Sequence, residues 1–388
     1  MRRARLGGLV LAACAGIGAG IAGADPAPKI AVTAEGGAEL DSNVRRSETG
    51  PAQADAPIAA PVARLGAKLT HTGRLLRGAY AVAAGAQSQT VLSGKEALSP
   101  ENMVLLSGDA RWIRPVGQRD VSVGLGLTGI DAEPTTDGVG ARTFRTLGGD
   151  AILALRGGDA RSLTVAVGGR DFVYKPEHLY DWRGPTASVR LELTLWERDE
   201  GARSLELSAL LELEARTFDR DSFANASKCA DNVPPSMKES CYTPTSLRRR
   251  DRFQRGELEL TWTGRFVAAA GYQLTVVDSN SYGQSLVRHR VSLSATRNLP
   301  WRLYGTALAT LQLDSYPDGL PVGLVINTQT FTATLEDENH SSLQARIARK
   351  IGAAWAIESR VAIYRNLGSE LDAEYRRFLL SVGAVYSR

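Results

Sequence analysis

Apolar and polar residues alternate along the segment 186–216. Between positions 188 and 195 the odd residues are Val189, Leu191, Leu193 and Leu195, and the even residues are all polar. A period of two indicates a β-strand with one apolar and one polar face. The alternation resumes at 203–216, after a polar segment at 197–202 that is typical of a turn. The pattern therefore predicts a β-hairpin.

Each arm of this hairpin is long for a strand of a soluble domain. An arm of about ten residues approaches the length with which a tilted strand crosses a bilayer. An amphipathic helix is the alternative for 204–216, because Leu, Glu and Ala favour helices. Leu205, Leu207, Leu211 and Leu213 would then be spread around the helix, whereas a helix packed on a core gathers them in one stripe.

The same unit recurs along the chain. The fold class that we predict is all-β, a transmembrane antiparallel β-barrel of about sixteen strands, with 14 to 18 as the range. A missed hairpin in 328–335 or between residues 41 and 60 would raise the number. The predicted strands are 29–42, 61–71, 78–91, 102–113, 118–130, 142–156, 160–174, 186–196, 203–218, 250–263, 266–279, 285–297, 301–315, 340–351, 354–366 and 373–387.

The connections between these strands alternate in length. Long links such as 45–60, 92–101 and 219–249 follow odd-numbered strands, and short links such as 157–159 and 264–265 follow even-numbered strands. Bacterial outer-membrane barrels have short turns on the periplasmic side and longer loops outside. A soluble sandwich or propeller has no reason to keep that order along the whole chain.

The two faces of the predicted strands differ in chemistry. One face carries uninterrupted apolar runs such as Val121 to Leu127 and Phe378 to Val382 at alternate positions, as lipid contact requires. The other face is polar and predicts a water-filled lumen. The candidate lumen-lining residues are Arg190, Glu192, Glu212, Glu214, Arg255, Glu257, Glu259, Arg288, Arg290, Arg302, Arg346, Glu358, Arg360 and Arg377.

Charges of one sign gather in these candidates. The glutamates lie mainly on three consecutive strands at 186–263, and the arginines on the five predicted strands from residue 285 onwards. One interpretation is a transverse field that orients polar solutes during transport. The other is that the charges form ion pairs across neighbouring strands. The pattern alone leaves both open.

Tryptophan placement supports two membrane interfaces. Five of the six tryptophans lie beside the predicted periplasmic links, as an aromatic girdle requires, and Trp182 lies at the other end. The parity of Trp196 and Tyr364 predicts that these two side chains face the lumen.

The first 24 residues resemble a secretory signal peptide. Three arginines precede an apolar stretch, and Ala22-Gly23-Ala24 is a small-residue cleavage site. We therefore expect a signal at 1–24 and the barrel at 25–388. An alternative is a lipoprotein box at 11–14 that would leave a lipidated Cys14. No later run approaches the eighteen apolar residues of a membrane helix.

The remaining composition excludes several functions. The formal net charge is +4 for the whole sequence, so no nucleic acid or acidic partner is indicated. The histidines His71, His178, His289 and His340 are dispersed, and no hydrolase, metalloprotease or phosphate-binding motif occurs. We expect no enzyme activity, no cofactor and no metal site.

Two segments near the ends resemble a known group of proteins. The run 39–44 and the run 343–366, followed by Tyr375-Arg376-Arg377, resemble the opening and closing of outer-membrane barrels of polysaccharide secretion systems. These relatives include the cellulose and poly-N-acetylglucosamine export porins and stand-alone myxobacterial export barrels. The cellulose-type porins carry a helical-repeat arm, whereas the first predicted strand here starts close to the cleavage site. The chain also ends Tyr386-Ser387-Arg388 where such barrels place a terminal aromatic residue.

The resemblance implies a monomeric conduit for a polysaccharide cargo, working with a periplasmic polysaccharide-export protein. Its surroundings would be membrane lipid and lipopolysaccharide in the outer membrane of a Gram-negative bacterium, and the barrel assembly machinery would insert it. The alternatives are a general diffusion porin or solute uptake channel, and an outer-membrane hydrolase or structural surface protein.

Cys229 and Cys241 lie in one polar segment with no apolar period. We predict a disulfide between them on the cell surface, because an oxidising compartment permits it and closure would constrain a long link. A metal pair is the alternative, although no nearby histidine completes a site. The assembled protein should resist maleimide labelling until it is reduced. Labelling of both thiols before reduction would disprove the disulfide.

Overall fold

The structure is a computed structural model, and it describes residues 29–46, 57–117, 120–135, 143–158, 160–175, 178–199, 201–225, 242–317, 340–365 and 375–388. Strands account for most of these residues. Two short 3-10 helices accompany them, η1 (Glu96–Glu101) and η2 (His178–Tyr180). In the part of the chain that the structure describes, no helix is long and apolar enough to cross a membrane.

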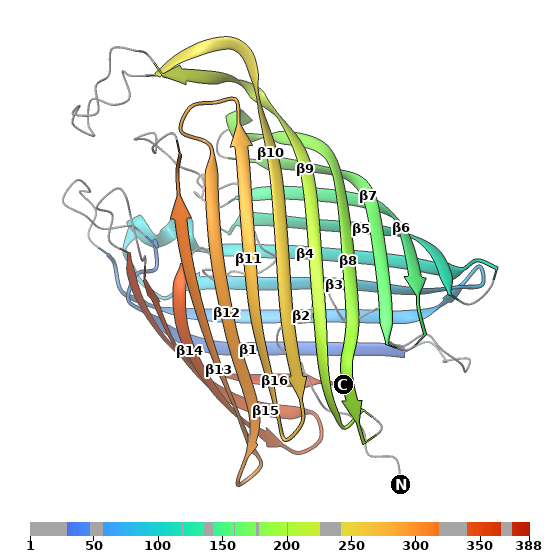
Figure 1. Ribbon diagram of the computed structural model, residues 1–388. Helices are drawn as coiled ribbons and strands as arrows, with labels where there is room; N and C mark the ends of the chain where they lie inside the picture. The colour runs from blue at the N-terminus through green and yellow to red at the C-terminus, as the bar shows by residue number, and fades with distance from the viewer. Residues whose placement is uncertain are drawn as a thin grey trace.

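The predicted barrel of sixteen antiparallel strands is confirmed. Each strand pairs with its neighbours in sequence, and the first pairs with the last, so the sheet closes on itself (Figure 1). The strands are β1 (Lys29–Asp41), β2 (Ala60–Leu75), β3 (Gly78–Val91), β4 (Met103–Pro115), β5 (Val121–Pro134), β6 (Phe144–Arg156), β7 (Arg161–Tyr174), β8 (Trp182–Arg198), β9 (Arg203–Asn225), β10 (Tyr242–Thr263), β11 (Phe266–Ser279), β12 (Leu286–Leu299), β13 (Leu303–Ser315), β14 (Ser341–Ile351), β15 (Trp355–Arg365) and β16 (Arg376–Ser387).

Strands β9 and β10 are longer than predicted, with 23 and 22 residues. Both continue beyond the neighbouring strands at the end of the barrel where the long links lie (Figure 1). The sequence 219–225 is polar at most positions, because neither face of a hairpin in water has to be apolar. The alternation of apolar and polar residues therefore ends before β9 does, and the prediction from the sequence ended this strand too early.

Tight turns join the strands at the opposite end. The turn between β2 and β3 places Leu76 and Arg77 at φ 52° and 61°, and the turn between β12 and β13 places Trp301 and Arg302 at φ 60°. Two successive residues at positive φ give the twist that connects adjacent antiparallel strands. In barrels of this type the short turns face the periplasm, and this orientation is used below.

The outer wall of the barrel is apolar. Side chains such as Leu125, Leu127, Leu293 and Val382 are more than half exposed, and they occupy alternate positions on their strands. Such a belt around a closed sheet is far larger than the apolar patches of soluble monomers. It therefore meets the hydrocarbon of a bilayer.

The tryptophan at position 196 faces outward, which corrects the lumen-facing orientation predicted from parity. A register shift between Thr194 and Trp196 marks a β-bulge in β8, and the extra residue turns Trp196 to the outer face. There its ring stacks on Trp262 at 5.5 Å between centroids. Tyr364, in contrast, is 1% exposed and lies on the inner side of β15, as its parity predicts.

An ion pair joins β1 and β16 along the line where the barrel closes, which we call the seam. The strands pair from Thr33 opposite Ser387 to Asp41 opposite Leu379. At the extracellular end Arg377 donates from Nε to Asp41 Oδ1 at 3.0 Å and from Nη2 to Oδ2 at 2.6 Å. Both side chains are almost fully buried, at 1% and 2% exposed. A bidentate charged pair of this kind fixes the register of the two strands as well as joining them.

The substitution Asp41→Ala should destabilise the barrel, because it leaves the Arg377 guanidinium buried without its closest carboxylate. Breaking a buried pair in this way costs about 3–5 kcal/mol. The compact band of an unboiled gel sample should therefore be lost at a lower temperature. Asp41→Leu combined with Arg377→Met removes both charges and should recover most of the loss.

Asp219→Ala is the control, since Asp219 pairs with Arg248 at 3.7 Å and both side chains are more than half exposed. An Asp41→Ala protein as heat-resistant as the Asp219→Ala protein would contradict a role for the seam pair.

Candidate functional site: the charged lumen of the barrel

The inner wall carries the predicted lumen residues, with one exception. Each lies at the strand parity opposite to the exposed leucines, and several join one another across strands. Arg302 does not lie on a strand: it occupies the turn before β13 at φ 60°. The others are Arg190 and Glu192 on β8, Glu212 and Glu214 on β9, Arg255, Glu257 and Glu259 on β10, Arg288 and Arg290 on β12, Arg346 on β14, Glu358 and Arg360 on β15, and Arg377 on β16.

Glu212 and Glu214 form the centre of an ion-pair network. Arg255 of β10 approaches Glu212 at 2.6 Å, and Arg170 of β7 lies 3.6 Å from Glu212 and 2.5 Å from Glu214. Arg216 approaches the second oxygen of Glu214 at 2.5 Å. Two carboxylates thus share three guanidinium groups from β7, β9 and β10, and this part of the wall carries no excess negative charge.

Gly184 on β8 makes this network possible. Arg170 pairs in register with Gly184, and its side chain passes across β8 to reach β9. A Cβ at Gly184 would lie 1.7 Å from the carbonyl oxygen of Ala215, which is far inside any real contact. The missing side chain therefore allows β8 and β9 to approach closely where the arginine crosses.

The predicted basic wall is also largely neutralised by carboxylates. Arg288 donates from Nε and Nη2 to Asp314 of β13 at 2.8 and 2.7 Å. Arg346 forms an ion pair with Glu358 of the neighbouring strand, and Arg377 pairs with Asp41 across the seam. For these residues the cross-strand interpretation describes the geometry, and the separation into an acidic and a basic wall does not.

Several carboxylates form no ion pair with an arginine or lysine among the described residues, and they include Glu192, Glu206, Glu257 and Glu259 on the inner wall of β8 to β10. Three of these four accept hydrogen bonds from hydroxyl groups: Ser162 Oγ donates to Glu192 at 2.8 Å and Ser204 Oγ to Glu206 at 2.9 Å. Thr261 Oγ1 donates to Glu259 at 3.4 Å.

These four glutamates lie close together on the inner wall. Ser208 of β9 is opposite Glu192 on one side and opposite Glu259 on the other, so these two carboxylates stand about 10 Å apart at the backbone. Glu206 precedes Ser208 by two residues on β9, and Glu257 precedes Glu259 by two on β10, so in these antiparallel strands Glu206 lies on the periplasmic side of that row and Glu257 on its extracellular side. We call this group the carboxylate patch. It faces the lumen in the periplasmic half of β8 to β10.

An aromatic rim lines the lumen towards the extracellular end, and the sequence analysis did not identify it. The rings of Phe144, Phe172 and Trp182 stack in succession at 5.9 and 5.8 Å between centroids. The Arg216 guanidinium lies 4.5 Å from the Trp182 ring and 4.2 Å from the Phe253 ring. All of these rings are buried, so they pack the rim and offer no open face to a solute.

A signal for this rim is present in the sequence. Phe144, Phe172, Trp182, Phe218 and Phe253 all have lumen parity near the long-link ends of β6 to β10. An aromatic residue at that parity on five consecutive strands predicts a ring of contacts once the barrel is assumed.

Other predicted features lie elsewhere or outside the described residues. No group of histidine, cysteine and carboxylate side chains that could hold a metal occurs in the described ranges. His289 and His71 face outward, where each interacts with a tyrosine, Tyr272 and Tyr80. Residues 1–24, Cys229 and Cys241 lie outside the described residues, so the signal peptide and the disulfide stay predictions.

The two segments that carry the resemblance to polysaccharide-secretion barrels meet in space. Asp41 and Asn43 belong to the first segment, and Asn43 Nδ2 lies 3.5 Å from the carbonyl oxygen of Arg376 in the second. Tyr375 packs with Tyr364 and Leu379 in one buried cluster beside them. The run 39–44 and residues 375–377 therefore lie at the seam of the barrel, whereas residues 343–365 form most of β14 and β15.

Comparison with known proteins identifies the fold. No protein-family model and no curated protein matches the sequence. Among solved structures, OprB of Pseudomonas putida is similar at a TM-score of 0.53 and 8% identity, over 93% of this chain and 94% of that chain. A loop-deletion mutant of OmpT, an outer membrane protein of Vibrio cholerae, gives 0.44 and 10%, over 94% and 100%. The TodX monoaromatic hydrocarbon channel, as a mutant, gives 0.39 and 10%, over 94% and 91%.

At such identities the likeness to OprB extends to the fold alone. Together with the closed sheet and its apolar belt, it places the chain among outer-membrane β-barrels of Gram-negative bacteria.

The substitution Gly184→Ala should impair assembly, because the new methyl group collides with the Ala215 carbonyl oxygen. We expect a lower fraction of the compact band in unboiled gel samples of outer membrane. Gly256→Ala is the matched control, since a Cβ there meets nothing within 4 Å. Equal assembly of the two variants would show that β8 and β9 can separate without cost at this position.

Proposed function

We propose that the protein is a passive diffusion channel for small polar solutes across the outer membrane. The observation that carries this proposal is the carboxylate patch, formed by Glu192, Glu206, Glu257 and Glu259 on the wall of a closed sixteen-stranded barrel. A barrel of this strand number encloses water, whereas about eight strands leave a lumen filled by side chains.

The electrostatics of the wall favour weak, local selection. Ion pairs such as Arg255 with Glu212 and Arg288 with Asp314 cancel charge within one or two strands. At larger distances the electric fields of the two opposite charges in each pair largely cancel. The four glutamates of the carboxylate patch form no ion pair with a described residue, and Arg190, which donates to Ser208 Oγ at 3.5 Å between Glu192 and Glu259, offsets only part of their charge. The patch therefore raises the local concentration of cations and lowers that of anions. A fixed charge of this kind biases passage without binding any one solute tightly.

Export of a polysaccharide with a periplasmic partner is the second candidate. The resemblance that suggests it rests on the run 39–44 and on the run 343–366 followed by residues 375–377, and no protein-family model or curated protein matches the chain to support it. Asp41 and Arg377, which belong to these segments, pair to close the barrel, and every barrel has to close, whatever its cargo. We therefore rank a solute channel above a polysaccharide conduit. A deletion strain that loses a surface polysaccharide but keeps small-solute uptake would reverse this order.

Replacing Glu192, Glu257 and Glu259 together by glutamine should shift the ion selectivity of the channel towards anions in planar bilayers. The reason is that the substitution removes negative charge from a wet wall and keeps the side-chain size. The shift in reversal potential should be larger near 0.1 M salt than at 1 M, where the Debye length falls from about 10 Å to about 3 Å.

The matched control replaces Asp131, Glu133 and Asp199, three carboxylates outside the lumen, by their amides. It should leave the selectivity unchanged. A triple lumen variant with wild-type selectivity at low salt would contradict the role of the patch, and a wild-type protein that never conducts would contradict the channel.

A further inference from the structure

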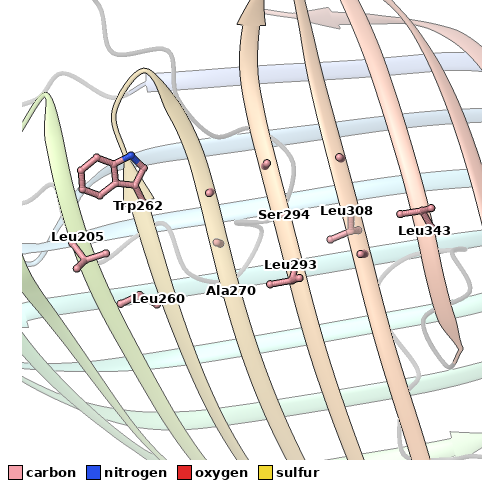
Figure 2. Close-up of a pocket in the computed structure, with 13 residues that line it drawn as sticks. Leu205, Leu260, Trp262, Ala270, Leu293, Ser294, Leu308 and Leu343 are labelled. Atoms are coloured by element: carbon pink, nitrogen blue, oxygen red, sulfur yellow. The ribbon is translucent and has the colours of Figure 1, made fainter.

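A groove runs along the outer wall of the barrel, across β10 to β14. Its volume is about 400 Å³, and its lining is apolar apart from Ser294. Figure 2 shows Leu205, Leu260 and Trp262 at one side of the groove and Leu343 at the other. The groove lies on the face that meets the membrane, so it is separate from the lumen and from whatever passes through it.

Alanine residues form the floor of the groove. The strand register places Ala268 of β11 opposite Ala295 of β12, Ala295 opposite Ala307 of β13, and Ala307 opposite Ala345 of β14. Four small side chains thus follow one another across neighbouring strands, over about 15 Å. The row begins beside Trp262, which is opposite Ala268.

Larger side chains bound this floor on the extracellular side. The next row towards that side contains Leu260, Leu293 and Leu343, with Ala270 and Ala309 between them. Leu293 and Leu343 are more than half exposed and stand out from the wall. The step between leucine and alanine makes a depression along the outer wall.

Two arginines lie at the periplasmic end of the groove, on the same outward face. Arg297 follows Ala295 by two residues on β12, and Arg349 is opposite Leu303 on β14. Gly305 of β13 lies opposite Arg297 on that side, and the Leu299 side chain extends over it, with Cδ1 3.1 Å from where a Cβ of Gly305 would lie. The two arginines are therefore two strands apart, and a small apolar surface lies between them. Both arginines are exposed, and no carboxylate pairs with either of them within the ranges that the structure describes.

Tryptophans mark the depth of these arginines. Trp301 in the turn between β12 and β13 is 81% exposed, and Trp355 at the start of β15 is 53% exposed. Exposed tryptophans of this kind collect at the level of lipid headgroups. Arg297 and Arg349 therefore stand where the phosphate groups of the periplasmic leaflet lie, and the alanine floor stands where the acyl chains lie.

We propose that this groove binds one anionic phospholipid of the periplasmic leaflet. Its headgroup phosphate accepts hydrogen bonds from Arg297 and Arg349, and one acyl chain lies on the alanine floor. Guanidinium groups suit a phosphate because they offer two parallel donors and keep their charge. A second copy of the barrel fits less well, since among the described residues the strands present no outward carboxylate near the periplasmic end, and Asp199 in the turn after β8 already pairs with Arg203.

The test is native mass spectrometry of the folded barrel, released from detergent that contains phosphatidylglycerol or phosphatidylcholine with the same acyl chains. Wild-type protein should retain one phosphatidylglycerol about tenfold better than phosphatidylcholine, because both lipids carry the phosphate but only phosphatidylcholine adds a cation that the two arginines repel. Arg297→Gln combined with Arg349→Gln should abolish the preference. Ala295→Leu combined with Ala307→Leu should fill the groove and lower the retention of both lipids.

Two matched controls separate the site from general lipid contact. Arg114→Gln with Arg161→Gln removes two exposed arginines from the outer face of β4 and β7, and Ala84→Leu with Ala151→Leu adds the same methyl groups elsewhere on the outer wall. Both should behave as wild type. The compact gel band reports folding, and valine replaces leucine if the groove variant does not assemble.

The proposal is overturned if the Arg297 and Arg349 variant keeps the preference, or if the filled groove retains lipid as wild type does. It is also overturned if the spectra show an oligomer of the barrel that the groove substitutions dissociate, because a second copy would then occupy this face.

Discussion

The hydrocarbon of the membrane offers no hydrogen-bond partner, and this constraint governs the whole structure. Each backbone N–H and C=O at membrane depth has to pair with another strand, so the sheet can have no open edge. The pairing of β1 with β16 meets this requirement. Arg377 and Asp41 add a directional contact at the place where the two ends of the described chain meet. This contact serves the closure of the barrel, whatever the barrel conducts.

Because the sheet is closed, the side chains of every strand alternate between the inner face, which meets water in the lumen, and the outer face, which meets lipid. Charged groups that face inward are close to one another across neighbouring strands, and most find a partner of opposite sign, as Arg255 and Glu212 do. Small residues such as Gly184 permit these contacts by allowing two strands to approach. The carboxylate patch stands out because its four glutamates form no ion pair in the part of the chain that the structure describes and the nearby Arg190 offsets only part of their charge, so negative charge remains available to act on solutes.

The outer wall has its own organisation. A β-bulge turns Trp196 to the membrane side, where it stacks on Trp262 beside the alanine floor. Aromatic rings and arginines lie at headgroup depth, and leucines and alanines lie deeper. From the headgroup level inwards, the outer wall therefore changes from charged and aromatic side chains to aliphatic ones, as a lipid changes from its headgroup to its acyl chain. This arrangement does not involve the lumen, so the two faces of the same strands can serve different ends.

The sequence by itself determined the number of strands, the order of long and short links, and the face of each strand that carries charge. These features follow from a period of two, which is local and can be read without knowing the neighbours of a strand. It did not determine how far β9 and β10 extend, because alternation has no meaning where both faces are in water. Nor could parity place Trp196, since one extra residue in a bulge reverses every orientation after it. Only the tertiary structure decided which charges cancel. Arg170 reaches Glu214 across an intervening strand, and Arg377 reaches Asp41 from the other end of the chain. Such contacts depend on the register of the strands and on the closure of the barrel, and a local sequence pattern contains neither.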